Sequence, residues 1–253
     1  MADQTAGYYI SHKEKLLKGF DATCALVRAS LVARYGETLA NALENETRQQ
    51  YEELIPEIPF IKGPRARALN TFLLISAQEL AVYKTLAKRG KSPAEAWELC
   101  HAALRLRLAA FPQWKRRFMR RFMFSGLVRR IVARRARKKQ RLCYGDFEIE
   151  YVVGKGEDFH FGVNYLQCGN YKFVAEHGGK TFAPFVCMSD IALGEAMGWG
   201  LIRTQTLADG CPHCDFRFKQ GAVTQISSKT AEVQETIERI RKKEAEHVGP
   251  ASR

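Results

Sequence analysis

Four of the seven cysteines in this 253-residue chain fall between positions 168 and 214, beside glycines, aspartates and predicted strand ends. Cys168 and Gly169 mark a change from a strand pattern to a helical turn. Backbone N–H groups and the helix dipole stabilise a thiolate at such a position, so Cys168 is a candidate nucleophile. The alternative is a small buried residue at a tight strand-to-helix corner.

Cys187 and Asp190 are three residues apart across the start of a predicted helix over residues 189–197. This spacing places a thiol and a carboxylate on one helix face, where they suit proton transfer or metal binding. Asp190 could equally serve only to complement the helix dipole.

The segment Cys211-Pro-His-Cys214 resembles half of a zinc site or a redox CxxC pair. A full zinc site needs a second ligand pair at similar spacing, and Cys168 and Cys187 are too far apart in sequence to supply one. We therefore predict no metal and no cofactor. If a metal is bound, the predicted ligands are Cys187, Cys211, His213 and Cys214.

Two histidines are candidate proton shuttles, because histidine changes its charge near neutral pH. Alternation along a predicted strand over residues 159–168 places His160 on the same face as Cys168. His213 lies within the CxxC turn.

Two further predicted strands carry the remaining candidates. In the strand over residues 214–219, Cys214 shares one face with the two phenylalanines and should point to the core or to a pocket. In the strand over residues 201–207, Arg203 stands among apolar neighbours and must find a carboxylate. That partner could be Asp190, Asp215 or an acidic ligand.

The elements that position these residues change in type near residue 143. Apolar residues at three- and four-residue spacing predict helices before this point, and alternation predicts short strands after it. We expect an α+β fold, with a helical N-terminal half packed on a small antiparallel sheet and short helices in the C-terminal half. The predicted regions are a helical region over 1–142 that includes a basic amphipathic helix over 113–141, a cysteine-rich candidate catalytic region over 143–222, and a charged helix and tail over 223–253.

The predicted helices and strands are placed by caps and turn residues. Ser92, Pro93 and Glu95 predict a helix start with a capping box. Gly36 predicts the end of an earlier helix, which begins at residue 12. Two strands over 147–153 and 159–168 are joined by a turn at residues 154–156.

Composition argues for an ordinary folded protein in a reducing compartment. The chain is 46% hydrophobic, its cysteine count is odd, and neither a leader pattern nor a run of 18 apolar residues is present. We expect a cytoplasmic protein with free thiols.

The net charge of +13 comes from one segment, because residues 115–141 hold thirteen Lys or Arg and no acidic residue. Three interpretations remain open: a solvated basic face, contact with an anionic membrane surface through residues 114–141, and binding of nucleic acid or of an anionic substrate. Motifs for specific nucleic-acid recognition are absent, so we expect no specific nucleic-acid partner. The oligomeric state is not predicted.

The candidate residues also form an ordered series along the chain. The series is Cys168-Gly169, Cys187-x-x-Asp190, Arg203-Thr204-x-Thr206-Leu207-Ala208-x-Gly210 and Cys214-Asp215-Phe216-Arg217-Phe218. It resembles the C-terminal half of the L-2-amino-thiazoline-4-carboxylic acid hydrolase family. This resemblance implies hydrolysis of a cyclic carbon–nitrogen, amidine-like bond in a small substrate that carries a carboxylate, with N-carbamoyl cysteine as the product of the named activity.

Within this hypothesis we predict Cys168 as the nucleophile, with Cys214 as the second candidate, or a water molecule activated by Asp190. Asp190 is the predicted acid/base, and Arg203 with Thr204 and Thr206 would bind the substrate. The alternative is a non-catalytic sensor of vinyl-reductase-like type that binds a small molecule or a metal. A third class is an accessory protein that uses its basic segment at a membrane.

Overall fold

The computed structural model describes residues 6–62, 66–137, 142–144, 147–154 and 158–247. The predicted turn at residues 154–156 lies largely outside the described residues, as do the side chain of Cys143 and the last four residues of the basic segment.

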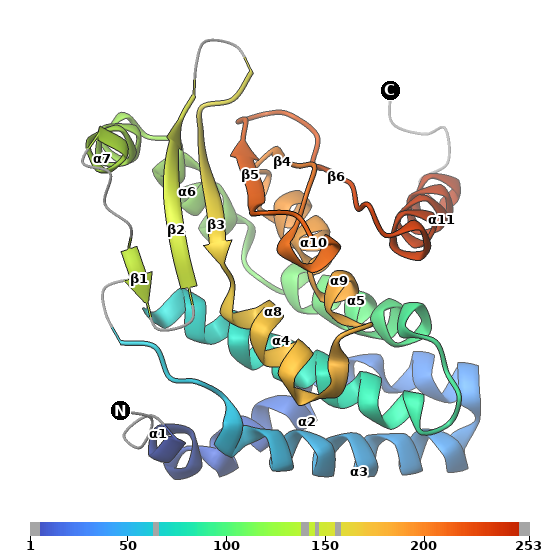
Figure 1. The fold of residues 1–253 in the computed structure, drawn as a ribbon. Coiled ribbons are helices and arrows are strands. Elements are labelled where there is room, and N and C mark those ends of the chain that lie inside the picture. The colour runs from blue at the N-terminus through green and yellow to red at the C-terminus, as the bar shows by residue number, and fades with distance from the viewer. Residues whose placement is uncertain (1–5, 63–65, 138–141, 145–146, 155–157, 248–253) are drawn as a thin grey trace.

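Helices make up the N-terminal part of the fold. They are α1 (Ala6–Ser11), α2 (Lys13–Tyr35), α3 (Glu37–Leu54), α4 (Ala66–Ala87), α5 (Pro93–Ala109), α6 (Gln113–Met123) and α7 (Gly126–Arg137), with a short 3₁₀ turn over Ile55–Glu57. In Figure 1, α2 and α3 form the outer layer, and α4 and α5 lie between that layer and the sheet. Within the described residues, these and the other helices are all too short or too polar to cross a membrane.

Local signals explain where two of these helices begin and end. Gly36 adopts φ 78°, a left-handed conformation that glycine tolerates, and it separates α2 from α3. Ser92 caps α5 by accepting a hydrogen bond from the Glu95 backbone N–H at 3.1 Å. The capping box is only half formed, because the Glu95 carboxylate accepts from the Tyr35 hydroxyl at 2.6 Å.

The prediction of one continuous basic helix over 113–141 is wrong. The described part forms two helices, α6 and α7, separated at Phe124 and Ser125. Phe124 is buried against the sheet, and the Ser125 hydroxyl accepts a hydrogen bond from the Val128 N–H at 3.4 Å. The chain therefore bends so that one aromatic ring can enter the core, and a serine starts the second helix.

The sheet has six strands in the order β1-β2-β3-β5-β4-β6. They are β1 (Leu142–Tyr144), β2 (Phe147–Val153), β3 (Phe161–Gln167), β4 (Leu201–Arg203), β5 (Cys214–Phe218) and β6 (Gln225–Ile226). All neighbouring pairs are antiparallel except β4 and β6, which are parallel. The predicted antiparallel sheet is therefore mixed at its β6 edge.

Short helices connect the strands of the C-terminal half. They are α8 (Gly169–Val174), a π-type turn (Ala175–Gly179), α9 (Ala183–Val186), α10 (Ser189–Met197), a 3₁₀ turn (Leu207–Asp209) and the terminal α11 (Ala231–His247). Helices α8 to α10 and strand β4 all lie in sequence between β3 and β5, which pair directly. This connection brings the cysteine-rich segments to one place on the sheet (Figure 1).

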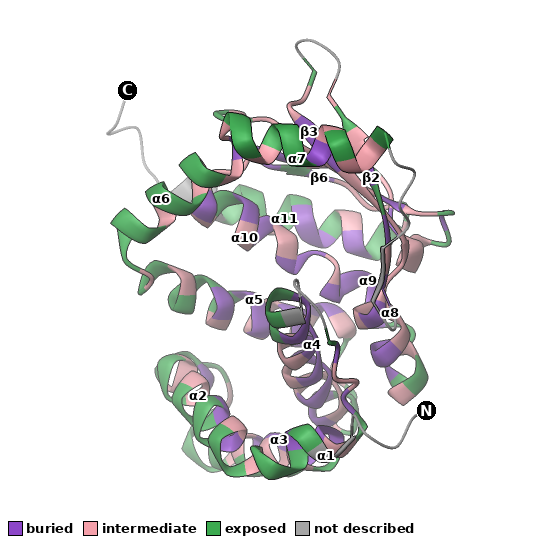
Figure 2. Cartoon of the chain, turned by 90° about the vertical axis from the view of Figure 1, so that its left-hand side faces the viewer, coloured by how far each residue is buried: buried purple, intermediate pink, exposed green. Residues whose placement is uncertain are grey.

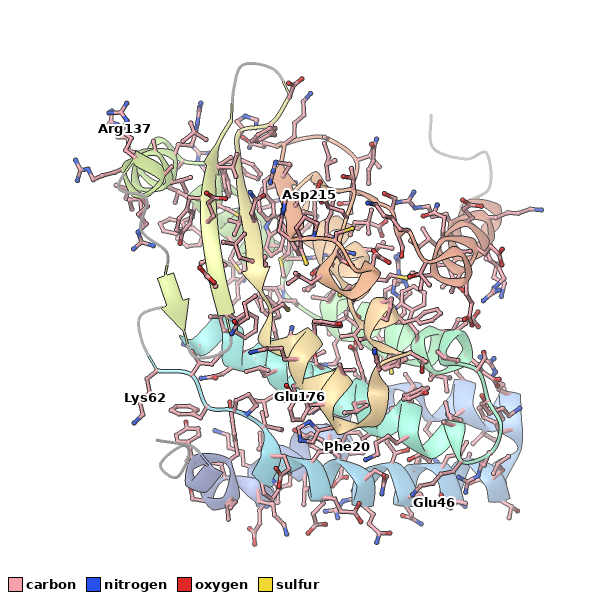
Figure 3. All side chains as sticks on the ribbon, in the orientation of Figure 1. Phe20, Glu46, Lys62, Arg137, Glu176 and Asp215 are labelled. Atoms are coloured by element: carbon pink, nitrogen blue, oxygen red, sulfur yellow. The ribbon has the colours of Figure 1, made fainter. Side chains whose placement is uncertain are left out.

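One face of the sheet packs against the helices, and buried residues concentrate there, as Figure 2 shows. The main core cluster takes Leu73 from α4, Phe185 from α9 and Val233 from α11. A smaller cluster holds α6 and α7 against β2 and β3. The predicted α+β fold is confirmed, and all three predicted regions contribute to these clusters. Side chains such as Phe20, labelled in Figure 3, fill the space between the helical layers.

Candidate active site

A cavity of about 250 Å³ lies between α4, α8, α10 and the inner face of the sheet. Apolar side chains form most of its wall, and a few polar groups converge on it. The groups that could do chemistry are Glu79, Cys168, Cys187, Ser189, Asp190, Arg203 and Cys214. Four of the predicted catalytic and substrate-binding residues therefore meet here, namely Cys168, Asp190, Arg203 and Cys214, together with Cys187 of the predicted metal ligands.

Arg203 is 2% exposed and is held by three neighbours. Its Nη1 donates to the Asp190 carboxylate and, at 2.7 Å, to the carbonyl oxygen of Cys187. Its guanidinium carbon lies 5.4 Å from the centre of the Phe216 ring. The predicted need for a carboxylate is thus met by Asp190.

One donor of Arg203 remains available. Its Nε is buried and has no hydrogen-bond partner among the described residues. A buried, unpaired donor costs free energy, which an acceptor on a bound ligand would recover. Since Arg203 lines the cavity, this N–H could bind a carboxylate there.

Cys168 precedes the first residue of α8 and lines the cavity. Burial raises the pKa of its thiol, and the neighbouring backbone N–H groups of Tyr171 and Asn170 oppose this shift. The charge of Asp190 raises the same pKa further and that of Arg203 lowers it. The resting group is a thiol, so it needs a base to become a nucleophile.

The two other cavity cysteines are less suited to attack. Burial raises the pKa of Cys187 well above its ordinary value, and that of Cys214 to about 12. The Cys214 sulfur accepts a hydrogen bond from the Leu207 N–H at 3.2 Å, which ties it to the neighbouring turn. As predicted, Cys214 shares its face of β5 with Phe216 and Phe218, and all three line the cavity.

Glu79 was missed by sequence reasoning. It comes from α4, is 4% exposed and accepts a hydrogen bond from the Ser189 hydroxyl at 2.7 Å. Its other carboxylate oxygen, Oε2, is buried without a partner among the described residues. The one signal in the sequence is an acidic residue within the apolar run that forms α4. Ser189 is the first residue of α10, and its hydroxyl turns to Glu79.

The two cavity carboxylates differ in the groups that surround them. Burial, together with the negative charge of Asp190, raises the pKa of Glu79 to about 8, so Glu79 is mostly protonated at neutral pH. Burial also raises the pKa of Asp190, but the charge and hydrogen bond of Arg203 oppose that shift. An acid and a base in one cavity are the requirement for proton transfer in both directions.

The structure does not place His160 near Cys168. The His160 ring packs against Phe124 at 5.3 Å between centroids, and its Nδ1 accepts from the Gln220 N–H at 3.3 Å. The expected shared face fails because both residues lie just outside β3: Cys168 packs on the main core, whereas His160 packs on Phe124 of the smaller cluster. His160 does not line the cavity.

His213, Thr204 and Thr206 also lie outside the cavity lining. The His213 ring contacts the Gln205 amide at 3.0 Å. The Thr204 hydroxyl donates to Asp215 at 2.6 Å; Figure 3 labels Asp215 on β5. These contacts hold the loop between β4 and β5, and they leave both the predicted proton shuttle His213 and the predicted substrate-binding residue Thr204 outside the cavity lining.

Thr206 fastens the same loop from its other end. Its hydroxyl accepts from the Asp209 N–H at 3.1 Å and donates to the Asp209 carboxylate at 2.8 Å. Asp209 in turn accepts from the hydroxyls of Ser228 and Thr230, which precede α11. The Thr-Leu-Ala-x-Gly motif thus connects the loop to the terminal helix.

The four ligands predicted for a metal do not converge. Cys187 and Cys214 line the cavity, whereas Cys211 and His213 do not. In the part of the chain that the structure describes, three or more Cys, His, Asp or Glu side chains nowhere come close enough to hold a metal ion.

One comparison with known proteins matches a long segment that contains every cavity residue named above as able to do chemistry. The family model described as L-2-amino-thiazoline-4-carboxylic acid hydrolase matches residues 71–218, more than half of the chain, and this range includes Glu79, Cys168, Asp190 and Arg203. The searches of curated proteins and of solved structures gave no match. The chain belongs to the L-2-amino-thiazoline-4-carboxylic acid hydrolase family.

Proposed function

We propose that this protein hydrolyses the ring of a small 2-amino-thiazoline-like carboxylate in the cavity, with Cys168 as nucleophile. The observation that carries the proposal is the convergence of Cys168, Asp190, Arg203 and Glu79 on one largely apolar cavity. The family supports hydrolysis in general, and these four groups supply the specific chemistry.

Binding uses charge at both ends of the substrate. The free Nε–H of Arg203 donates to the substrate carboxylate. The protonated amidine then lies near the Asp190 carboxylate and Cys168. A cation next to a thiol favours the thiolate, which offsets the effect of burial on Cys168.

The first step forms a covalent adduct. The Cys168 sulfur attacks the carbon between the ring nitrogen and the ring sulfur, and its proton passes to the Asp190 carboxylate. The ring carbon–sulfur bond of the tetrahedral adduct then breaks. The leaving thiolate takes the proton of Glu79, whose carboxyl is protonated at neutral pH.

The second step is hydrolysis. A water molecule adds to the same carbon and gives one proton back to Glu79. The Cys168 sulfur leaves and recovers its proton from Asp190, and the proton that entered with the amidine is released to solvent. One water is consumed and every protein group is restored.

The product decides which bond breaks. An N-carbamoyl thiol keeps both nitrogens on the former amidine carbon, so oxygen replaces sulfur and the ring opens at the carbon–sulfur bond. The sequence-based hypothesis of carbon–nitrogen cleavage would instead give an S-carbamoyl product with a free amine.

The test is mass spectrometry of the small molecules after incubation with L-2-amino-thiazoline-4-carboxylate. We expect N-carbamoyl cysteine, recognised by a thiol that iodoacetamide alkylates and by the lack of a reactive amine. An S-carbamoyl product would overturn carbon–sulfur cleavage and keep the hydrolase. Substrate that stays unchanged would overturn the proposed activity on this compound.

A further inference from the structure

We propose that α6 and α7 form a docking surface for an anionic phospholipid membrane, with the aromatic side chains of α6 inserted among the lipids. This proposal stands on the surface alone and does not depend on the reaction in the cavity.

Helix α6 presents different residues on its two faces. On the inner face, Arg120 approaches Gly198 at the end of α10, and Met123 lines the active-site cavity. On the outer face Trp114, Phe118 and Phe122 follow one another every four residues, and they are 67%, 66% and 55% exposed. The core of the described residues does not bury this aromatic stripe, and such an exposed apolar surface is typical of an interaction site.

Helix α7 follows α6 in the chain and also exposes apolar side chains. Val132 is buried against the sheet and anchors the helix, whereas Leu127 and Ile131 are exposed. Of the twelve large apolar side chains that are exposed among the described residues, six lie on α6 and α7. Figure 2 shows both helices along the outside of the molecule, largely in the colour of exposed residues.

The charge of this surface is complementary to anionic lipid. Residues 113–137 contain ten Lys or Arg and no acidic residue. Lys115, Arg117 and Arg121 flank the aromatic stripe and are exposed, and Arg137 extends from the end of α7 in Figure 3. Each basic residue near an anionic membrane contributes attraction, and the apolar stripe adds burial in the lipid interface.

The exposed apolar side chains of α6 and α7 favour a membrane over nucleic acid as the partner. Phosphate contacts need only the basic residues, and they would leave Leu127 and Ile131 in water. An interfacial helix buries such side chains and keeps its arginines at the headgroups. The mixture of both residue types on one surface therefore favours lipid.

The experiment is co-sedimentation of the full-length protein with two kinds of phosphatidylcholine vesicle. One kind contains no anionic lipid, and the other contains about 30% phosphatidylglycerol, which gives its surface a negative potential. We expect binding to the anionic vesicles alone at physiological salt. The triple variant Lys115→Gln/Arg117→Gln/Arg121→Gln should bind roughly a hundredfold more weakly, at about fivefold for each charge. A matched variant, Lys15→Gln/Lys88→Gln/Lys180→Gln, removes three exposed charges elsewhere and should lose much less.

A second pair of variants tests insertion. Trp114→Ala/Phe118→Ala/Phe122→Ala keeps every charge and should weaken binding at least tenfold, with loss of the blue shift of Trp fluorescence that the unaltered protein shows on anionic vesicles. Leu26→Ala/Leu106→Ala/Val223→Ala removes exposed apolar groups elsewhere and should bind normally. Failure to bind anionic vesicles, unchanged binding by the aromatic variant, or tighter binding to duplex DNA or RNA than to vesicles would each overturn the proposal.

Discussion

The ion pair between the buried Arg203 and the half-buried Asp190 is the central electrostatic feature of the site. Arg203 is almost fully enclosed, and its Nη1 donates to Asp190 and to the Cys187 carbonyl. Removing one partner of such a pair leaves an uncompensated buried charge, whereas replacing both by apolar groups is often nearly neutral.

We predict that Asp190→Asn lowers the free energy of unfolding by about 3 kcal/mol. The double variant Asp190→Asn/Arg203→Met should be less destabilised than the single one, because it no longer buries a charge. Urea unfolding of the two variants and of Arg203→Met gives the full cycle. Additive effects would show that the two side chains do not interact.

Glu79 gives a separate prediction on pH. The pKa of its carboxyl has the ordinary value of 4.5 in the unfolded chain, and burial raises this pKa to about 8 in the fold. Between these values the folded protein binds one more proton, so the free energy of unfolding falls as pH rises, by up to about 1.4 kcal/mol per pH unit. Below pH 4.5 and above about pH 8 this contribution no longer changes.

Glu79→Gln removes the titrating group and keeps the shape of the side chain. Urea unfolding between pH 5 and 8 should show that the stability advantage of the variant over the unaltered protein grows with pH. Parallel stability curves for the two proteins would mean that Glu79 is ionised in the fold.

Single residues were predictable where a physical need was visible in the sequence. An arginine among apolar residues requires a carboxylate, and the structure supplies Asp190. Glu79 could not be assigned, because its contact to Ser189 spans 110 residues and depends on how α4 packs. His160 was misplaced for the same reason, since alternation along a strand does not reveal what packs beyond its ends.

At the scale of elements, the approach of α10 to β4 determines where Asp190 meets Arg203. Gly194 of α10 permits this approach, because a Cβ atom there would lie 2.7 Å from the Thr224 hydroxyl oxygen and 3.2 Å from the Leu201 Cβ. Thr224 and Leu201 are both buried, so neither can move away freely.

We predict that Gly194→Ala destabilises the protein by about 1–3 kcal/mol through overpacking, although alanine favours a helix. Gly19→Ala is the matched control, because its Cβ would meet nothing within 4 Å in the middle of α2. That variant should gain up to about 1 kcal/mol. Urea unfolding measures both, and a stabilised Gly194→Ala would contradict the close packing.

Elements with local end signals were predicted well. The bounds of α10 match the expected residues 189–197, and Gly198 ends it in a left-handed conformation. The basic segment was predicted as one helix because its apolar spacing continues through Phe124, and only contact with the sheet explains the break there. Strand β6 was missed because it has two residues and pairs with a distant strand.

At the scale of the molecule, the helices and the sheet share one core, and the candidate active-site cavity lies where they meet. The fold class followed from the change of periodicity along the sequence, since that change is local. The cavity itself could not be predicted from the sequence, because its wall combines residues from α4 to β5 that only tertiary packing brings together.

The central claim is that Cys168 attacks the substrate, and kcat/KM for ring opening by cysteine variants tests it most directly. We predict a loss of at least about a hundredfold for Cys168→Ser, a much smaller loss for Cys214→Ser, and normal activity for Cys211→Ser, which lies outside the cavity lining. Full activity in Cys168→Ser would contradict this claim, and full activity in Cys214→Ser as well would contradict cysteine catalysis in this site.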